Sequence, residues 1–198
     1  MSLFNEPIQL TINDGEVLYY PRFFNRQEAD IIFKQLFKET PWQEDDIKVF
    51  GKVYKQPRLT ALYGSENKPY SYSNITMHPQ LFSALLNDIK VKVEEASYES
   101  FNTVLLNLYR DGKDSNGWHA DDEKELGENP VIASLSFGEE RYFNLRHKKD
   151  KTQKHKLLLN HGSLLLMKGE TQHHWHHQIP KTSKQIGSRI NLTFRQLI

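Results

Sequence analysis

From Phe101 onward the chain consists mainly of short apolar runs separated by turn residues. Runs rich in Leu, Ile, Val, Phe and Thr predict β-strands, and they cover residues 102–109, 131–137, 142–146, 156–159, 163–167 and 188–196. Pairs such as Asn116-Gly117 and His161-Gly162 provide turn chemistry between them. Many short strands joined in this way indicate an antiparallel barrel or jelly roll, and two helices upstream would brace it.

The first hundred residues are expected to hold those helices and a β-ribbon. A helix is predicted over 26–38, because Asn25 suits its N-cap and Glu28 falls at the third helical position. A second helix is predicted from near Pro79 to about Glu95. Its apolar stripe would be Leu81, Leu85 and Ile89. The remaining expected elements are a strand at 16–20 and a hairpin or ribbon formed by 47–54 and 59–63.

Length and composition restrict the class of protein. A chain of 198 residues with 37% hydrophobic residues suits one domain with a real core, so we expect a single domain over 1–198. The chain has no Cys, which excludes disulfides, thiolate zinc sites and Fe–S clusters. No run approaches the ~20 apolar residues that cross a bilayer, and residues 1–10 do not resemble a secretory signal. The expected compartment is the cytoplasm, or the nucleus if the organism is eukaryotic.

The segment from Asn116 to Asp122 holds the most informative pattern. His119 and Asp121 are two residues apart, so on an extended segment both side chains point the same way. A third ligand would come from the histidine-rich run 173–177. Two His and one carboxylate on one face of an octahedron leave three positions open, as in non-haem Fe(II) oxygenases, where a chelating 2-oxo acid and O2 bind. Taken alone, a His-x-Asp pair is more often a surface turn.

The C-terminal strand strengthens this interpretation. In an extended conformation, one face carries Arg189, Asn191, Thr193 and Arg195, and the opposite face is apolar. Such a polar face suits either solvent or a dicarboxylate inside a barrel, because Arg binds carboxylates through a bidentate fork. Arg189 and Arg195 would lie roughly 20 Å apart along the strand. One of them should therefore anchor the far end of a cofactor, and the other should act near the metal or its ligands.

With these features together, the chain resembles the AlkB family of Fe(II)- and 2-oxoglutarate-dependent dioxygenases, and most of all the branch of the second and third human AlkB homologues. The matching motifs follow the family's order. They are NLYRDG at 107–112, HADDE at 119–123, IASLSFG at 132–138, RHK at 146–148, HGSLLLM at 161–167, HQIP at 177–180 and RINLTFR at 189–195. The resemblance implies a mainly β (α+β) fold. Its core would be a double-stranded β-helix (jelly roll) over about 101–198, flanked by N-terminal helices and a β-hairpin nucleotide-recognition lid over about 1–100.

The resemblance also assigns the metal and cofactor residues. The iron ligands would be His119, Asp121 and His177, with His177 chosen because the family places its last ligand just before a turn ending in Pro, here Pro180. His176 is the main rival, although on a strand it would face the opposite way. The 2-oxoglutarate contacts would be Asn107, Tyr109, Arg189, Thr193 and Arg195, and Asn191 shares their strand face.

Substrate residues are implied in the N-terminal half and beside the metal motif. Phe50, Gly51 and Lys52 resemble a finger that fills the gap left by an extruded base, since a base must leave its stack before it can be oxidised. Tyr70 and Tyr72 match an aromatic pair over the flipped base. Asp122 matches a carboxylate that reads the exocyclic amine of that base. The alternative for the aromatic residues is packing within a hairpin, and for Asp122 a solvated turn.

Basic residues gather in two places although the net charge is only +1. One group would lie on the finger hairpin, and both would meet phosphates. The first comprises Lys48, Lys52, Lys55 and Arg58, and the second Arg141, Arg146, Lys148, Lys149, Lys151, Lys154 and Lys156.

The implied activity is oxidative dealkylation of N-alkylated bases such as 1-methyladenine and 3-methylcytosine in DNA, with Fe(II), 2-oxoglutarate and O2 as cofactors and formaldehyde and succinate as products. The expected partner is alkylated single- or double-stranded DNA, with RNA as an alternative, and no membrane; a monomer is expected. Two other hypotheses remain at this stage. One is a 2-oxoglutarate oxygenase that acts on RNA, protein or a small molecule, and the other is a non-catalytic binding module.

Overall fold

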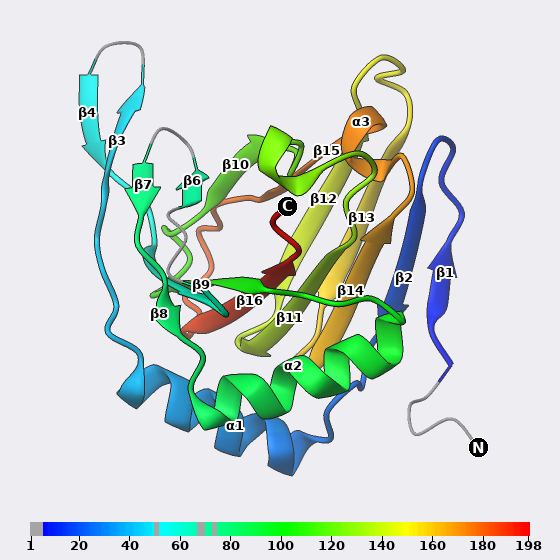
Figure 1. The fold of residues 1–198 in the computed structure, drawn as a ribbon. Coiled ribbons are helices and arrows are strands. Elements are labelled where there is room, and N and C mark those ends of the chain that lie inside the picture. The colour runs from blue at the N-terminus through cyan, green and yellow to red at the C-terminus, as the bar shows by residue number, and fades with distance from the viewer. Residues whose placement is uncertain (1–5, 50–51, 67–69, 73–74) are drawn as a thin grey trace.

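The structure is a computed structural model that describes residues 6–49, 52–66, 70–72 and 75–198. Its core is formed by two antiparallel sheets (Figure 1). The larger sheet runs in spatial order through β1 (Ile8–Leu10), β2 (Glu16–Tyr20), β14 (Ser163–Lys168), β11 (Ile132–Gly138), β16 (Arg189–Arg195), β9 (Thr103–Tyr109), β5 (Leu59–Gly64) and β8 (Gln80–Leu81), the last pairing parallel to β5. The smaller sheet runs through β10 (Asn116–His119), β15 (Trp175–Ile179), β12 (Arg141–His147) and β13 (Lys154–Leu159).

Alternation along the central strands divides the core into two layers. On β16, Ile190, Leu192 and Phe194 belong to the apolar cluster that also contains the helix residues. On β9, Leu105 and Tyr109 point the other way, toward the smaller sheet. The polar residues of β16 share this second face, and all seven residues of the strand are buried. The space between the two sheets is therefore lined partly by polar side chains.

Two helices, α1 (Arg26–Glu39) and α2 (Ala84–Ser97), cover the other face of the larger sheet (Figure 1). Helix α1 begins as predicted, with a capping box between Asn25 and Glu28. The predicted start of the second helix at Pro79 is wrong. Ser83 caps α2 through its side chain, and the preceding residues form the short strand β8. Leu81 is consequently 73% exposed and does not belong to the helix stripe.

The connections hold two hairpins and two short helical turns. Strands β3 (Asp46–Val49) and β4 (Lys52–Lys55) form a hairpin that projects beyond the sheets, and β6 (Tyr70–Tyr72) pairs with β7 (Ile75–Met77) (Figure 1). The expected pairing of 47–54 with 59–63 is wrong, because 59–64 forms β5 beside β9. The turn η1 (Lys124–Leu126) follows the metal motif, and α3 (Thr171–His174) precedes β15. The jelly-roll class is confirmed, as are the six predicted C-terminal strands to within a few residues.

Candidate metal centre

Strand pairing brings the three candidate ligands together between the two sheets. In the antiparallel pair β10 and β15, His119 lies directly opposite His177, and their ring centroids are 4.3 Å apart. Asp121 follows β10, and its Oδ2 lies 3.6 Å from Nε2 of His177. One candidate ligand atom from each residue lies within 4.8 Å of the others. These three side chains could therefore hold one ion.

The neighbours of His119 favour the tautomer in which Nε2 is unprotonated and can bind a metal. Its Nδ1 lies 2.7 Å from the Gly117 carbonyl, which can only accept, so Nδ1 carries the proton. The amide of Asn116 approaches Nε2 at 3.2 Å, where it donates to a lone pair. Both contacts agree on the tautomer with an unprotonated Nε2. A backbone carbonyl on the other ring nitrogen is a common way to orient a ligating histidine.

The charges at the centre suit a cation. Burial alone would raise the pKa of Asp121, but Arg195 and the two histidines outweigh it and hold this pKa well below its usual range. Arg195 donates from Nη2 to Oδ1 of Asp121 at 2.6 Å, which leaves Oδ2 toward His177. Burial and the neighbouring His119 lower the pKa of His177 to about 3. At neutral pH the centre thus offers a carboxylate and an uncharged imidazole, the forms that bind metals.

A second group in the described part of the chain, Asp14, His147 and His174, also brings its possible ligand atoms within 4.8 Å of one another. Its tautomer is unfavourable for a metal. The backbone N–H of Asp150 donates to Nδ1 of His147 at 2.9 Å, so the proton resides on Nε2, which faces Asp14 at 3.3 Å. Because Nδ1 accepts from Asp150 and Nε2 carries the ring proton, His147 has no free lone pair for a metal, and the first group is the better metal candidate.

One cavity joins the metal candidates to the predicted cofactor residues. Its lining includes His119, Asp121, His177, Asn107, Tyr109, Arg189, Asn191, Thr193 and Arg195. The side chain of Phe143 also contributes, and its ring stacks on His177 at 5.2 Å. The structure thus brings together all nine residues for which the sequence predicts metal or cofactor contacts.

Arg189 has the features of a carboxylate-binding residue. It is 1% exposed, and Nη2 donates to Oγ of Ser136 at 2.9 Å. No hydrogen-bond acceptor among the described residues meets its Nε and Nη1. Burial lowers the pKa of this guanidinium to about 10, and its carbon Cζ lies 5.1 Å from the centroid of the Tyr109 ring. A buried cation with donors to spare fits an anionic group such as a carboxylate of 2-oxoglutarate.

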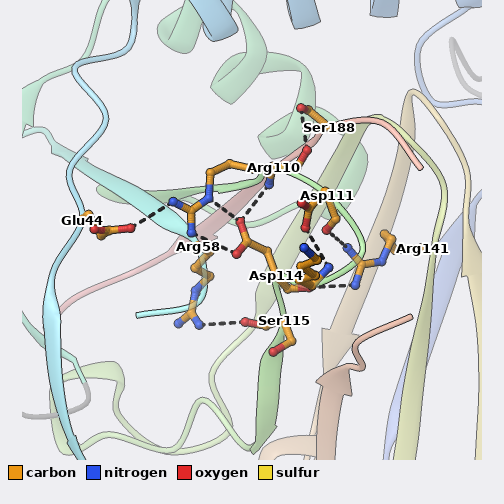
Figure 2. A network of polar contacts seen from close by, with 9 residues as sticks. Glu44, Arg58, Arg110, Asp111, Asp114, Ser115, Arg141 and Ser188 are labelled. Atoms are coloured by element: carbon orange, nitrogen blue, oxygen red, sulfur yellow. Dashed lines mark hydrogen bonds and ion pairs between the residues drawn. The ribbon is translucent and has the colours of Figure 1, made fainter. Parts of the chain in front are cut away.

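The loop between β9 and β10, residues 110–115, is held by a network of ionic and polar contacts (Figure 2). Asp114 accepts from the backbone N–H and the guanidinium of Arg110, and Arg110 also contacts Glu44 at 2.9 Å. Arg141, from β12, donates to the carbonyls of Asp111, Asp114 and Pro180. Because β10 follows directly, this network fixes the strand that carries His119.

The prediction that Arg58 and Arg141 meet phosphates is wrong, because both side chains are buried. Arg58 is 4% exposed, and its Nε donates to Oδ1 of Asn107 at 2.7 Å. Arg141 is 3% exposed and belongs to the loop network described above. Both arginines therefore support residues around the cavity. The sequence did not reveal this role, because their hydrogen-bond partners are distant along the chain. Gln172, whose Oε1 accepts from the backbone N–H of Asp121 at 2.9 Å, was also missed.

The predicted substrate residues are described to different extents. Phe50 and Gly51 lie outside the described residues. Lys52 begins β4, and Tyr70 and Tyr72 bound β6, so only their strand positions are described. Asp122 lies beside the metal candidates, and Nζ of Lys148 contacts its Oδ2 at 2.9 Å.

A family model for the 2OG-Fe(II) oxygenase superfamily matches residues 16–195. The chain belongs to this superfamily. Membership confirms Fe(II), 2-oxoglutarate and O2 as the cofactors expected from the sequence. In the described ranges, no helix is both long and apolar enough to span a membrane.

Individual relatives confirm the resemblance to the AlkB family. The chain is 45% identical over 190 residues to "Alpha-ketoglutarate-dependent dioxygenase alkB homolog 3" of Homo sapiens, covering 91% of this chain and 66% of that protein. It is 39% identical over 189 residues to "DNA oxidative demethylase ALKBH2" of Homo sapiens, covering 90% of this chain and 72% of the relative. The solved structure of OsALKBH1 matches with a TM-score of 0.69 at 16% identity, covering 96% of this chain and all of that one, and this likeness concerns the fold.

Proposed function

We propose that this protein oxidatively removes N-alkyl groups from nucleobases in DNA, such as those of 1-methyladenine and 3-methylcytosine. The observation that carries the proposal is the single cavity in which His119, Asp121 and His177 meet the unsatisfied donors of Arg189. Relatives that are named as an alkB homolog 3 dioxygenase and a DNA oxidative demethylase support the same activity and substrate.

In this proposal His119, Asp121 and His177 hold Fe(II). When bound, iron with 2-oxoglutarate and O2 supplies the oxidising chemistry that hydroxylates the N-alkyl carbon. The product, a hemiaminal, loses formaldehyde and leaves the repaired base. Arg195 keeps Asp121 ionised and oriented through its 2.6 Å contact, and Arg58 holds the amide of Asn107 toward the cavity. Arg189, Tyr109, Asn191 and Thr193 complete the 2-oxoglutarate site.

In this proposal, residues other than the metal and cofactor set recognise the substrate. Asp122 would accept a hydrogen bond from the exocyclic amine of the flipped base. Phe50, Gly51 and Lys52 would replace the extruded base in the stack, and Tyr70 with Tyr72 would stack on it. The projecting β3–β4 hairpin supports this assignment, because Val53 and Tyr54 within it are 64% and 51% exposed. Exposed apolar side chains on such a hairpin are available to contact bases.

The proposal extends to the domain organisation, oligomeric state, cellular location and substrate of the protein. We propose that 1–198 acts as one catalytic domain, which the family match over residues 16–195 supports, and that the protein is a monomer. Its DNA substrate would place it inside the cell, in the nucleus if the organism is eukaryotic. DNA is proposed as the main substrate and RNA as a further one.

The experiment measures formaldehyde released from oligonucleotides that carry one 1-methyladenine or 3-methylcytosine, in single and double strands of DNA and RNA. Release should require both Fe(II) and 2-oxoglutarate and should be lost in His119→Ala and Asp121→Ala. Phe50→Ala should reduce turnover of the duplex more than of the single strand. Turnover that survives either ligand substitution would contradict the proposal. Activity on RNA alone would move the assignment to that substrate.

A further inference from the structure

The segment that carries Asp121 and Asp122 lies outside any strand or helix. It connects β10, which ends at His119, to the turn η1, which begins at Lys124. No sheet ladder fixes its backbone. Its two acidic side chains nevertheless point in different directions, one buried toward His177 and the other 48% exposed. Other contacts must set the position of both carboxylates.

Gln172 provides the first of these contacts. This residue of α3 is fully buried, at 0% exposure. Its Oε1 accepts from the backbone N–H of Asp121 at 2.9 Å, while its Nε2 lies 3.5 Å from the sulfur of Met167. The side-chain amide is therefore held at both ends, and it fixes the backbone of Asp121, whereas Arg195 contacts the side-chain carboxylate of the same residue. An apolar side chain in its place would leave a buried N–H without a partner.

Lys148 provides the second contact and joins it to the first. Its Nζ donates to Oδ2 of Asp122 at 2.9 Å and to the backbone carbonyl of Gln172 at 2.8 Å. Its own backbone N–H donates to the carbonyl of His174 at 2.6 Å, which ties the residue after β12 to the end of α3. The side chain of Lys148 is 23% exposed, so it is partly shielded from water.

We propose that Gln172 and Lys148 form a clamp that positions the two neighbouring carboxylates for different tasks. Gln172 sets the orientation of Asp121 toward the metal, and Lys148 sets that of Asp122 toward the base. The assignment of these tasks rests on the proposed function. Both members of the clamp are positioning residues, since each acts through an aspartate and neither contacts the metal candidates' ligand atoms in the described structure.

The clamp has a consequence for specificity. Because Lys148 occupies Oδ2 of Asp122, Oδ1 remains as the acceptor for an incoming donor. An ionised carboxylate can only accept, so it favours bases with an exocyclic amine and disfavours bases with a carbonyl at that position. Without Lys148, the half-exposed carboxylate would be free to rotate into solvent. The preference for amine-bearing bases should then weaken even though Asp122 is present.

Metal affinity tests the first half of the clamp. Gln172→Met keeps the volume of the side chain but removes the acceptor, and it should weaken Mn(II) binding by about tenfold or more in titration calorimetry. Gln153→Met makes the same chemical change at a loop residue whose amide contacts Asp150, and it should leave the affinity at the wild-type value. Circular dichroism establishes that each variant is folded. Wild-type Mn(II) affinity in a folded Gln172→Met protein would overturn this half of the proposal.

Base discrimination tests the second half and does not depend on Gln172→Met folding. The readout is the ratio of turnover on 3-methylcytosine to turnover on 3-methylthymine in otherwise identical oligonucleotides. Lys148→Met should lower this ratio roughly fivefold while Mn(II) affinity stays at the wild-type value. Lys149→Met removes the same charge from the next, exposed residue and should preserve the ratio. An unchanged ratio in Lys148→Met would overturn the role of Lys148.

Failure of the proposed function and failure of the clamp would give different results. If the wild type binds Mn(II) but turns over neither oligonucleotide, the proposed function and the base-reading role of Asp122 both fail, while the metal titration still decides the role of Gln172. If the wild type turns over both lesions and the variants match it in affinity and ratio, only the clamp fails.

Discussion

Arg189 and Arg195 belong to one strand face, yet their surroundings differ. Arg195 donates to Oδ1 of Asp121 and so belongs to the metal candidates. Arg189 lies at the other end of β16, beside Tyr109 and Ser136, and its Nε and Nη1 have no acceptor in the described part of the chain. A guanidinium in this state is stabilised most by an anionic ligand. The predicted division of roles between the two arginines therefore has a physical basis in the structure.

Arg189→Met should weaken 2-oxoglutarate binding while the fold persists. Loss of hydrogen bonds to a charged group corresponds to about 1.5–3 kcal/mol, or roughly 10- to 150-fold in Kd. Titration calorimetry with 2-oxoglutarate in the presence of Mn(II) measures the change. The metal-free melting temperature should not fall, because the variant removes a buried cation that lacks a full set of partners. Arg146→Met is the control, since Arg146 stacks on Trp118, away from the predicted cofactor residues. Equal Kd values for the two variants would contradict the assignment.

The lowered pKa of His177 predicts how the metal-free protein responds to acid. Its pKa is about 3 in the folded state and ordinarily about 6.5 in an unfolded chain. As pH falls from 6.5 toward 4, the unfolded state takes up this proton and the folded state does not, so the free energy of unfolding decreases. The slope should approach ~1.4 kcal/mol per pH unit. Urea unfolding in a chelator measures it, and His177→Gln should show a shallower slope. Parallel slopes would show that His177 is not the group responsible.

At the scale of elements, the loop 110–115 depends on one buried carboxylate. Asp114 is 5% exposed, and Arg110 donates to it from the backbone, from Nε and from Nη2. Burial acts to raise the pKa of Asp114, but the hydrogen bonds and charge of Arg110 outweigh it and the pKa lies below its usual value. This carboxylate therefore stabilises the folded state at neutral pH, and the stabilisation is lost as pH falls through its folded pKa.

Asp114→Asn should lower the free energy of unfolding by about 1–3 kcal/mol at pH 7, because a buried acceptor loses its charge and part of its hydrogen bonding. Urea denaturation measures this change. Glu44→Gln removes a more exposed carboxylate from the same arginine and should change stability by less than ~0.5 kcal/mol. Both carboxylates appear in Figure 2. If the two variants are equally stable, the loop does not depend on Asp114.

Elements with local signals were predictable from the sequence, and elements that depend on distant partners were not. The start of α1 is defined by a local signal, the capping box, which spans only the four residues from Asn25 to Glu28. Pro79 suggested a helix start, but Ser83 provides the cap that α2 uses. Residues 59–63 were expected to pair with the nearby segment 47–54, but β5 pairs with β9, which lies far along the chain. Pairing of that kind is decided by the whole sheet.

At the scale of the whole molecule, some features of the site were predictable from the sequence and others depend on how the chain folds. Period-two alternation predicted that the polar residues of β16 share a face, and the family resemblance supplied the choice of His177 over His176. His177 is 4% exposed, whereas its neighbour is half-buried on the other side of β15. The buried positions of Arg58 and Arg141 could not be predicted, because a basic side chain reads as exposed until its acceptors are known. Those acceptors come from other strands and loops.

The convergence of two distant segments, one with His119 and Asp121 and the other with His177, on one ion predicts a linkage between metal binding and global stability. Any ligand that binds only the folded state stabilises it, by ~2.7 kcal/mol at a concentration 100 times its Kd. For a chain of this size, Mn(II) at that level should raise the melting temperature by roughly 5–10 °C. 2-Oxoglutarate should add a further rise only when the metal is present, because its chelation needs the ion. Differential scanning calorimetry measures both effects.

Three variants show where that metal binds. His119→Ala should abolish the rise in melting temperature, whereas Asp122→Asn, which alters the adjacent carboxylate, should retain it because Asp122 faces Lys148 and not the other metal candidates. His174→Ala tests the second group of possible ligands and should also retain the rise, since the tautomer of His147 disfavours a metal there. A rise that persists in His119→Ala and disappears in His174→Ala would place the metal in that second group, outside the jelly-roll cavity, and the assignment of the catalytic centre would be wrong.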